Sequence, residues 1–322
     1  MNVLVLGGAG YIGSHMVRFL LECGDQVTVF DNLSTGHRFL AGTATFVQGD
    51  ILDRRALDTV LHEHGPFDAA IHFCARSLVG ESATDPALYY RNNVVGTLNL
   101  LDALRDSGHR RLVFSSTAAV YGAPQAPLIA ENHPTLPINP YGRSKRMIEQ
   151  VLADYAMAYG IDSVSLRYFN AAGAHPSGEI GELHEPETHL IPNVLRAAAG
   201  LAPLKVFGTD YPTPDGSCIR DYVHVCDLAQ AHRLAITHLA TNPGAHVFNL
   251  GNGNGFSVLE IICAAEQVTG RKIAWSRAER RIGDPSSLVA DASCARTTLG
   301  WQPSWTDIEK IIGSAWEFTR QR

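Results

Sequence analysis

The sequence predicts an α/β protein with a doubly wound parallel sheet and a smaller, interleaved α+β domain. Three features indicate this fold. Short apolar strands alternate with helical patterns through the first half, a glycine-rich turn follows the first strand, and the second half has a different, loop-rich pattern. Strands that are apolar throughout are typical of parallel sheets covered on both faces, and their alternation with helices indicates a doubly wound sheet.

The expected elements follow in chain order. Strands are expected at residues 3–6, 27–31, 45–48, 69–73, 112–116 and 164–168, with helices between them at 13–22, 54–62, 87–106 and 140–159. The segment 170–216 is rich in Gly, Pro and His and holds one helix near 191–199, a composition typical of loops that line sites. The remainder is expected to form a helix at 225–239, a strand at 247–250 and helices at 257–268, 293–299 and 306–318.

Composition excludes several classes of protein. Apolar residues make up 45% of the chain and charged residues 18%, so it is not intrinsically disordered. The formal charge of -6 leaves no basic face, and we expect no nucleic-acid partner. No apolar stretch approaches about 18 residues, so we expect no membrane span. The start, residues 1–6, has no basic region and runs into glycines, which indicates a first strand rather than a signal peptide.

The cysteines and histidines show no metal-binding pattern. The 6 cysteines are scattered without a C-x-x-C motif, so we expect free thiols in a reducing cytoplasm. The 14 histidines form no H-E-x-x-H motif. We therefore expect a cytoplasmic protein without a metal.

A glycine-rich turn follows the first strand and opens a helix. Gly7, Gly10 and Gly13 have the spacing G-x-x-G-x-x-G. The first glycine makes the tight turn, the second lets the backbone approach a pyrophosphate, and the third lets helix and strand pack closely. The helix start also offers free N–H groups to phosphates, and we assign Tyr11 and Ile12 to the cofactor with the glycines. This predicts a Rossmann-type dinucleotide site, and a purely structural glycine turn is the alternative.

Polar residues at the ends of the next two strands are assigned to the adenosine half of the cofactor. Asp31 ends the second strand, where a carboxylate binds the ribose and repels a 2′-phosphate, which favours NAD over NADP. The alternative is a strand-end aspartate that opens a turn, and Arg38 is the residue that would serve a 2′-phosphate. Asn32 beside it, and Asp50 with Ile51 after the third strand, are further cofactor candidates.

Tyr141 and Lys145 form a Y-x-x-x-K pair on the predicted helix 140–159. Residues four apart share a helical face, so the hydroxyl and the ammonium both reach one cofactor. A free phenol with a pKa of about 10 is a poor base, and lowering that pKa to near 7 takes roughly 4 kcal/mol. An ammonium together with a positive nicotinamide ring can supply this stabilisation of the phenolate. A surface tyrosine stacked on a lysine stem is the alternative.

A run of hydroxyl side chains, Ser115, Ser116 and Thr117, closes the fifth strand. The carboxyl ends of parallel strands face the ligand crevice, so one hydroxyl is placed to bridge Tyr141 and a substrate oxygen. We choose Thr117, since it comes last and is expected to leave the sheet. Capping of the following turn is the alternative.

Together these motifs resemble the extended short-chain dehydrogenase/reductases, and the likeness to their NAD-dependent epimerase/dehydratase family covers essentially the whole chain. Further motifs resemble those of family members that act on UDP-sugars, at residues 72–73, 79–82, 92–94, 120–122, 166–170, 173–176, 220–225 and 281–284. The resemblance gives residues 1–168, with a return segment at about 218–251, as the NAD-binding domain. Residues 169–217 and 252–322 are then the nucleotide-sugar domain.

The resemblance implies an isomerase that interconverts UDP-glucose and UDP-galactose with a tightly bound NAD, which is regenerated in each turnover. Tyr141 would take the proton of the sugar 4-hydroxyl while hydride leaves C4, and the 4-keto sugar would then rotate and take the hydride back. The implied cofactor contacts are Phe73, Ala75, Asn92, Ser115, Tyr141, Lys145 and Tyr168. A homodimer paired through helices 87–106 and 140–159 is also implied.

Residues of the second domain are implied to hold the UDP-sugar. Arg220 and Arg281 would clamp the diphosphate through charge-assisted hydrogen bonds, Phe207 would flank the uracil, and Asp284 would accept from the uridine ribose. The resemblance adds Thr117, Asn170, Tyr222 and the backbone at His189 and Leu190.

Three alternatives concern the substrate and the reaction. Some family members carry tyrosine where this chain has Leu288, or asparagine where it has His189, so a UDP-N-acetylglucosamine or UDP-pentose 4-epimerase stays open. A 4,6-dehydratase needs proton-transferring carboxylates directly after the threonine, and here Ala118 and Ala119 follow Thr117. A non-catalytic NAD sensor typically lacks the tyrosine or lysine, and both are present.

Overall fold

The computed structural model describes residues 1–281 and 284–322. Its larger sheet has seven parallel strands in the order β10-β6-β5-β4-β1-β2-β3. These strands are β1 (Asn2–Leu6), β2 (Gln26–Asp31), β3 (Thr45–Gln48), β4 (Ala69–His72), β5 (Arg111–Thr117), β6 (Asp162–Tyr168) and β10 (Ala245–Leu250). The chain runs outward from β1 in one direction and then continues from β4 in the other. The predicted doubly wound sheet is confirmed, and its ligand crevice lies at the carboxyl ends of β1 and β4.

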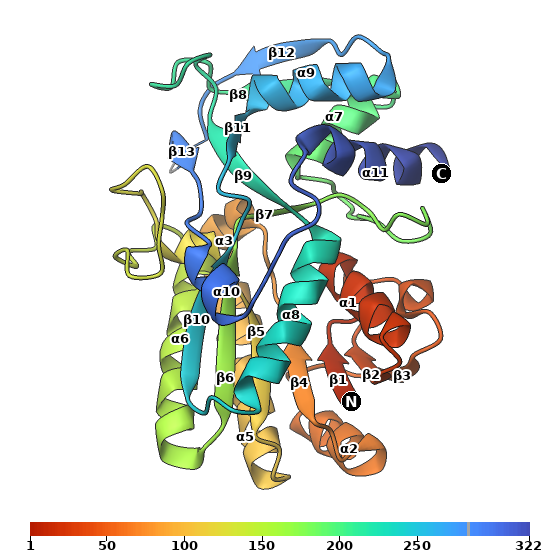
Figure 1. Ribbon diagram of the computed structural model, residues 1–322, viewed down its shortest axis with the longest axis vertical. Helices are drawn as coiled ribbons and strands as arrows, with labels where there is room; N and C mark the ends of the chain where they lie inside the picture. Colours follow the sequence, from red (N-terminus) through yellow and green to blue (C-terminus); the bar gives the residue numbers. More distant parts are fainter. Residues whose placement is uncertain (282–283) are drawn as a thin grey trace.

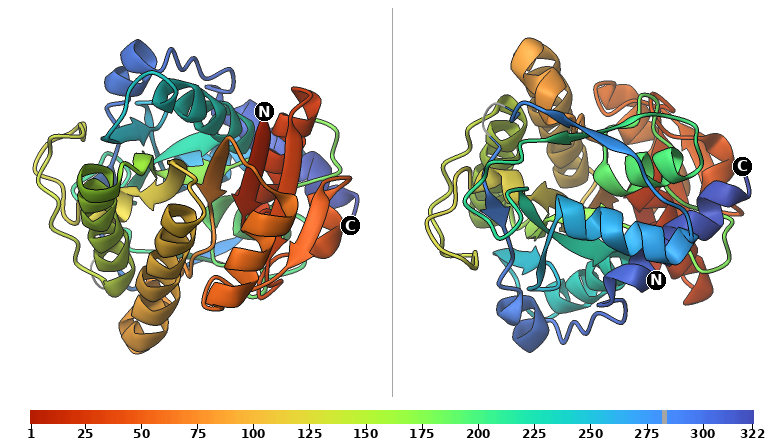
Figure 2. Two further views of the ribbon diagram at one scale, coloured as in Figure 1. Left: turned by 90° about the horizontal axis from the view of Figure 1, so that it is seen from below. Right: turned by 90° about the horizontal axis from the view of Figure 1, so that it is seen from above.

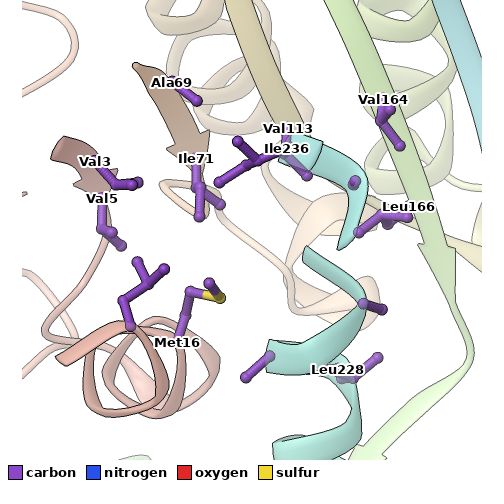
Figure 3. Close-up of a cluster of buried hydrophobic side chains, with 14 of the residues drawn as sticks. Val3, Val5, Met16, Ala69, Ile71, Val113, Val164, Leu166, Leu228 and Ile236 are labelled. Atoms are coloured by element: carbon purple, nitrogen blue, oxygen red, sulfur yellow. The ribbon is translucent and has the colours of Figure 1, made fainter. Parts of the chain in front are cut away.

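Helices cover both faces of this sheet (Figures 1 and 2). One face packs against α1 (Tyr11–Glu22) and α8 (Val225–Leu239), and the other against α2 (Arg54–His64), α5 (Gly96–Asp106) and α6 (Pro140–Tyr159). Figure 3 shows the first face, where Val3, Val5 and Ile71 of the strands meet Met16 of α1 and Leu228 of α8. Each such side chain contributes about 1.5–3 kcal/mol on burial, so the apolar strands hold the crevice in place.

The predicted helix 87–106 is not uniform. The chain forms α3 (Val79–Thr84), α4 (Pro86–Tyr89), a π-helical segment η2 (Tyr90–Val95) and then α5. Asp85 caps α4, since its Oδ1 accepts from Leu88 N at 3.1 Å. The wider turn places Asn93 in the interior, 1% exposed, and π-helical turns of this kind are frequent at functional sites.

The second domain contains short strands that sequence analysis did not predict. β7 (Asn170–Ala172), β9 (Ile219–His224), β11 (Gly255–Ser257) and β13 (Ser287–Leu288) form a mixed sheet, and β8 (Leu204–Phe207) pairs with β12 (Trp275–Ala278). The helices here are α7 (Leu190–Ala198), α9 (Val258–Thr269) and α11 (Ile308–Arg320), which share one core, while α10 (Ser293–Thr298) lies against β10. β9 pairs within this second sheet, and the helix that follows it, α8, packs on the larger sheet.

Short 3₁₀ turns complete the fold at η1 (Arg38–Ala41) and η3 (Ala118–Val120). Within the described ranges, no helix is both long and apolar enough to cross a membrane. The six cysteines are free.

Candidate active site

The three glycines of the first turn are required for different reasons. Gly7 has a φ of +82°, and a Cβ on Gly13 would lie 2.1 Å from Gly7 O. The fold itself therefore demands glycine at both positions. A Cβ on Gly10 would have only one neighbour among the described residues, Gly7 O at 3.5 Å, which is an ordinary contact. The protein leaves open the space over Gly10 that a Cβ would fill, and this space fits a pyrophosphate group.

Helix α1 begins beside this space. Its N-cap, Gly10, has no side chain to accept from the first turn, so the N–H groups at the helix start and the positive end of the helix dipole are free for an anion. The Tyr11 side chain points elsewhere, since its hydroxyl donates to Gly173 O at 2.6 Å. The side chain of Ile12 packs against the core of the large sheet. Tyr11 and Ile12 thus offer their backbone to a cofactor.

Asp31 is buried at the end of β2, where both of its carboxylate oxygens have backbone partners. Oδ2 accepts from Ala9 N at 2.9 Å and Oδ1 from Leu33 N at 2.8 Å. The carboxylate therefore opens the turn after β2, as the alternative reading expected. It also ties β2 to the glycine turn, which places a carboxylate beside the space over Gly10.

The neighbouring adenosine candidates lie together. Asn32 donates from Nδ2 to Asp50 Oδ2 at 2.9 Å, and Asp50 Oδ1 accepts from Leu52 N at 2.8 Å. Ile51 is 3% exposed and packs in the core between the sheet and its helices. Arg38 stacks on Phe46, with its Cζ 4.1 Å from the ring centroid.

The predicted catalytic residues meet at the carboxyl end of β5. Asn139 caps α6 by accepting from Gly142 N at 2.8 Å, which sets Tyr141 in the first helical turn. Lys145, one turn later, is 2% exposed, and its Nζ donates to Ser115 O at 2.6 Å. The Thr117 hydroxyl is close enough to Tyr141 to lower the pKa of the phenol. The structure therefore brings all of the predicted catalytic groups to one edge of the sheet.

Burial shifts the pKa values of both Tyr141 and Lys145. Burial raises the pKa of Tyr141, and the Thr117 hydroxyl lowers that pKa in part. Burial also lowers the pKa of Lys145 to about 7. The lysine alone therefore does not bring the phenol pKa close to neutral, and the positive charge of an oxidised nicotinamide is needed as well.

Thr117 differs from its expected position. It is the last residue of β5 and pairs in register with Tyr168, so it has not left the sheet. Its hydroxyl accepts from Ala119 N at 3.1 Å and caps η3. The capping role that was the alternative is thus observed, together with the contact to Tyr141. Tyr168, a cofactor candidate, is buried and hydrogen-bonded to the Ser115 hydroxyl.

Asn93 is a functional residue that sequence analysis missed. Its side-chain amide pairs with the backbone of Arg76 at 2.9 and 3.0 Å, and Nδ2 also donates to Ser144 Oγ at 3.0 Å. It therefore ties the loop after β4 to the catalytic helix. Asn92, the predicted cofactor residue, donates to Asn93 Oδ1 at 2.9 Å. The feature of the sequence that could have predicted this role is the pair of adjacent asparagines within an apolar helical pattern.

The loop after β4 also carries two cofactor candidates. Phe73 and Ala75 are both half-buried. The ring of Phe73 lies 4.8 Å from that of His232 on α8.

A buried ion pair lies under the same edge and was also missed. Arg167 of β6 binds Glu149 of α6 through Nε at 2.8 Å and Nη2 at 2.7 Å. Ser116 Oγ donates to Glu149 Oε1 at 2.6 Å. Because Glu149 is four residues beyond Lys145, this network fixes the helix face that carries the lysine. The four-residue spacing of Lys145 and Glu149 was the feature of the sequence that could have predicted this network.

The nucleotide-sugar candidates come together from separate segments. The Arg281 guanidinium lies 4.4 Å from the ring centroid of Phe207 in β8. Arg220 of β9 forms an ion pair with Asp284 and donates to Pro285 O at 2.9 Å. Of the motif at 281–284, residues 282 and 283 lie outside the described residues.

Other substrate candidates have different surroundings. Asn170 donates to Asp221 O at 2.9 Å. Tyr222 is 4% exposed and packs in one core with residues of α7, α9 and α11. Leu190 begins α7, and the His189 ring before it pairs with Glu182 and Glu187.

The fold and this edge define a dinucleotide-binding enzyme of the short-chain dehydrogenase/reductase class. A model of the NAD dependent epimerase/dehydratase family matches residues 3–251. The chain belongs to that family, and the predicted resemblance is confirmed.

Known proteins support the same assignment over the full chain. It is 52% identical over 322 residues to the UDP-glucose 4-epimerase of Halalkalibacterium halodurans, covering 100% of this chain and 96% of that protein. The Brucella ovis UDP-glucose 4-epimerase, solved in complex with NAD, is 50% identical with a TM-score of 0.95, covering 98% of both chains. The Bifidobacterium longum enzyme, solved with NAD+ and UDP, is 37% identical with a TM-score of 0.95, covering 100% of this chain and 99% of that one.

Proposed function

We propose that this epimerase, an isomerase, interconverts UDP-glucose and UDP-galactose by inverting the configuration at sugar C4. One observation carries the proposal: Tyr141 and the buried Lys145 meet at the carboxyl end of β5, close to Thr117. The relatives named above are UDP-glucose 4-epimerases. They favour this sugar pair over an N-acetylated hexose or a pentose.

The residues at the crevice fit NAD. The open space over Gly10 and the free start of α1 would hold the pyrophosphate, and Asp31 would hold the adenosine ribose. NAD held there would supply reversible hydride transfer at sugar C4.

The catalytic edge supplies proton transfer. Tyr141 receives the proton of the 4-hydroxyl as C4 is oxidised and gives it back as C4 is reduced. The Thr117 hydroxyl, close to the phenol, would orient the sugar oxygen toward it. Lys145 stays in place because Ser115 O holds its ammonium at 2.6 Å, so its position relative to the phenol is fixed through the cycle.

The second domain holds the nucleotide and leaves the sugar free to turn. Arg281 and Phe207 form a flat, positively charged surface suited to the UDP end. Arg220 reaches the diphosphate with its charge partly balanced by Asp284. Binding at the UDP end alone allows the 4-keto sugar to rotate about its link to the diphosphate and present its other face.

Incubation of the purified protein with UDP-galactose, without added NAD, tests the proposal. We expect UDP-glucose as the product, with Tyr141→Phe as the inactive control. A stable keto product would instead indicate a dehydratase. Intact substrate would indicate an NAD-binding protein without catalysis.

A homodimer in the cytoplasm is part of the proposal. Its support is that Val95 beside α5 and Met147 on α6 are 47% and 43% exposed, apolar residues near the helices expected to pair. The free cysteines agree with a reducing compartment. Light scattering of the purified protein should give twice the mass of the chain, and a monomer mass would contradict the dimer.

A further inference from the structure

Two glutamates and two histidines converge in the loop that joins β7 to α7, the green segment in Figure 1. They are Glu182, His184, Glu187 and His189, and one ligand atom from each lies within 4.8 Å of the others. All four come from one short segment with the spacing E-x-H-x-x-E-x-H. Their positions are therefore set locally, with little chain entropy to lose on closing a site.

Three of the four polar contacts have hydrogen-bond lengths, somewhat shorter than the ligand spacing of a metal site. His189 Nδ1 lies 2.7 Å from Glu182 Oε1 and 3.0 Å from Glu187 Oε1. His184 Nδ1 lies 3.0 Å from Glu182 Oε1 and 4.0 Å from Glu187 Oε2. Ligands held at about 2.0–2.2 Å around a tetrahedral zinc ion are roughly 3.3 Å apart, so small side-chain adjustments suffice.

The charge of the cluster also suits a divalent cation. The side chains of Glu182 and Glu187 are 8% and 4% exposed. Across residues 1–281 and 284–322, no lysine or arginine forms an ion pair with either carboxylate, and only the two histidines do. Two buried negative charges without a permanent cation are costly. A divalent ion would balance both charges with the histidines neutral.

We propose that Glu182, His184, Glu187 and His189 bind one divalent transition-metal ion, and that this ion is zinc. Two imidazole nitrogens with two carboxylate oxygens suit zinc, and four protein ligands from one segment are typical of a closed, structural site. This proposal departs from the expectation of no metal, because that expectation considered only H-E-x-x-H and cysteine spacings.

The position of the cluster gives the metal a structural role. His189 is the residue directly before α7, so the ion fixes the start of that helix and the backbone at His189–Leu190. On the other side, the His184 ring lies 6.3 Å from that of Tyr11, in the first turn of α1. A filled site therefore braces the second domain against the dinucleotide-binding turn.

Metal analysis tests the site directly. Protein is stripped with a chelator, dialysed against buffered zinc and then against metal-free buffer, and its zinc is measured by plasma mass spectrometry. We expect about one zinc per chain in the wild type and in a His62→Ala/His64→Ala control on α2, and a loss of at least tenfold in His184→Ala and in Glu182→Gln. Wild type without zinc would leave a proton-bridged cluster as the explanation and overturn the proposal, as would zinc retained in both variants.

Cobalt(II) distinguishes this site from binding by cysteine, since Cys23 and Cys263 are exposed. Cobalt in the proposed site gives visible absorption of a tetrahedral centre without thiolate charge-transfer bands in the near ultraviolet. Thiolate bands that persist in Glu182→Gln would contradict the assignment. Glu182→Gln keeps the shape of the side chain, and its circular dichroism melt shows whether lost metal reflects lost ligation or lost folding.

Discussion

The catalytic edge and the proposed nucleotide-sugar end of this protein are built in different ways. At the catalytic edge, Tyr141 and Lys145 stand on one helix, and the lysine is 2% exposed and hydrogen-bonded to Ser115 O. At the sugar end, Arg220 and Arg281 come from separate segments that meet only in the folded chain, and Arg281 is exposed. The reacting groups are thus fixed before substrate arrives, while the clamp stays accessible to a substrate that must enter and leave.

The largest effect expected at the catalytic edge is that of Tyr141→Phe. Loss of the proton-transferring hydroxyl should lower kcat by about 100- to 10,000-fold while NAD stays bound. Turnover is followed from UDP-galactose, and bound NAD from the absorbance of denatured protein. Tyr155→Phe is the matched control, because this hydroxyl lies on the same helix but contacts Asp102 at 2.9 Å, away from the site. Similar rates for both variants would remove Tyr141 from the mechanism.

The ion pair below the catalytic edge should matter for folding. Glu149→Ala leaves the Arg167 guanidinium buried without its partner, which should cost about 3–5 kcal/mol in free energy of unfolding. Urea denaturation measures this. Glu317→Ala on α11 is the control, because its pair with Arg320 is half-exposed and should contribute less than about 1 kcal/mol. Equal costs would show that the buried network does not hold the edge together.

Two substitutions in the glycine turn should affect NAD binding and fold stability separately. Gly10→Ala should weaken NAD binding by roughly 10- to 150-fold, as expected for a lost charge-assisted hydrogen bond of about 1.5–3 kcal/mol, with an unchanged melting temperature of the NAD-free protein. Gly13→Ala should lower that melting temperature, because its Cβ would lie 2.1 Å from Gly7 O. Fluorescence titration and calorimetry measure the two quantities. A destabilised Gly10→Ala would mean that the fold, and not the cofactor, requires this glycine.

The smallest effect is expected at the sugar end. Arg281→Ala removes the cation over Phe207 and should raise KM up to about tenfold, the equivalent of roughly 1.4 kcal/mol, with kcat little changed. Arg277→Ala, an exposed arginine of β12, serves as the control. A fall in kcat without a change in KM would place Arg281 at the reacting sugar instead of the nucleotide.

The sequence predicts well those features that depend on the spacing of residues close together in the chain. The alternation of strands and helices gave the larger sheet, and the i, i+4 spacing brought Tyr141 and Lys145 to one place. The short strands β8 and β9 were missed, because three to six residues carry little periodicity and their pairing partners are distant in the chain.

The sequence analysis also did not predict which polar residues are buried. Asn93 and Glu149 have residue types that usually lie at the surface, and only the fold shows that they are enclosed and hydrogen-bonded. The direction of the Tyr141 pKa shift also required the structure, since burial raises this pKa and the Thr117 hydroxyl lowers it.

Transfer of the C4 hydrogen within the active site is the central claim, and proton NMR of the reaction in D₂O tests it most directly. UDP-galactose is converted by the purified protein, and the C4 position of the UDP-glucose formed is examined. We predict that C4 keeps its original hydrogen, because the hydride leaves and returns without exchange with solvent. Deuterium at C4 would contradict this account.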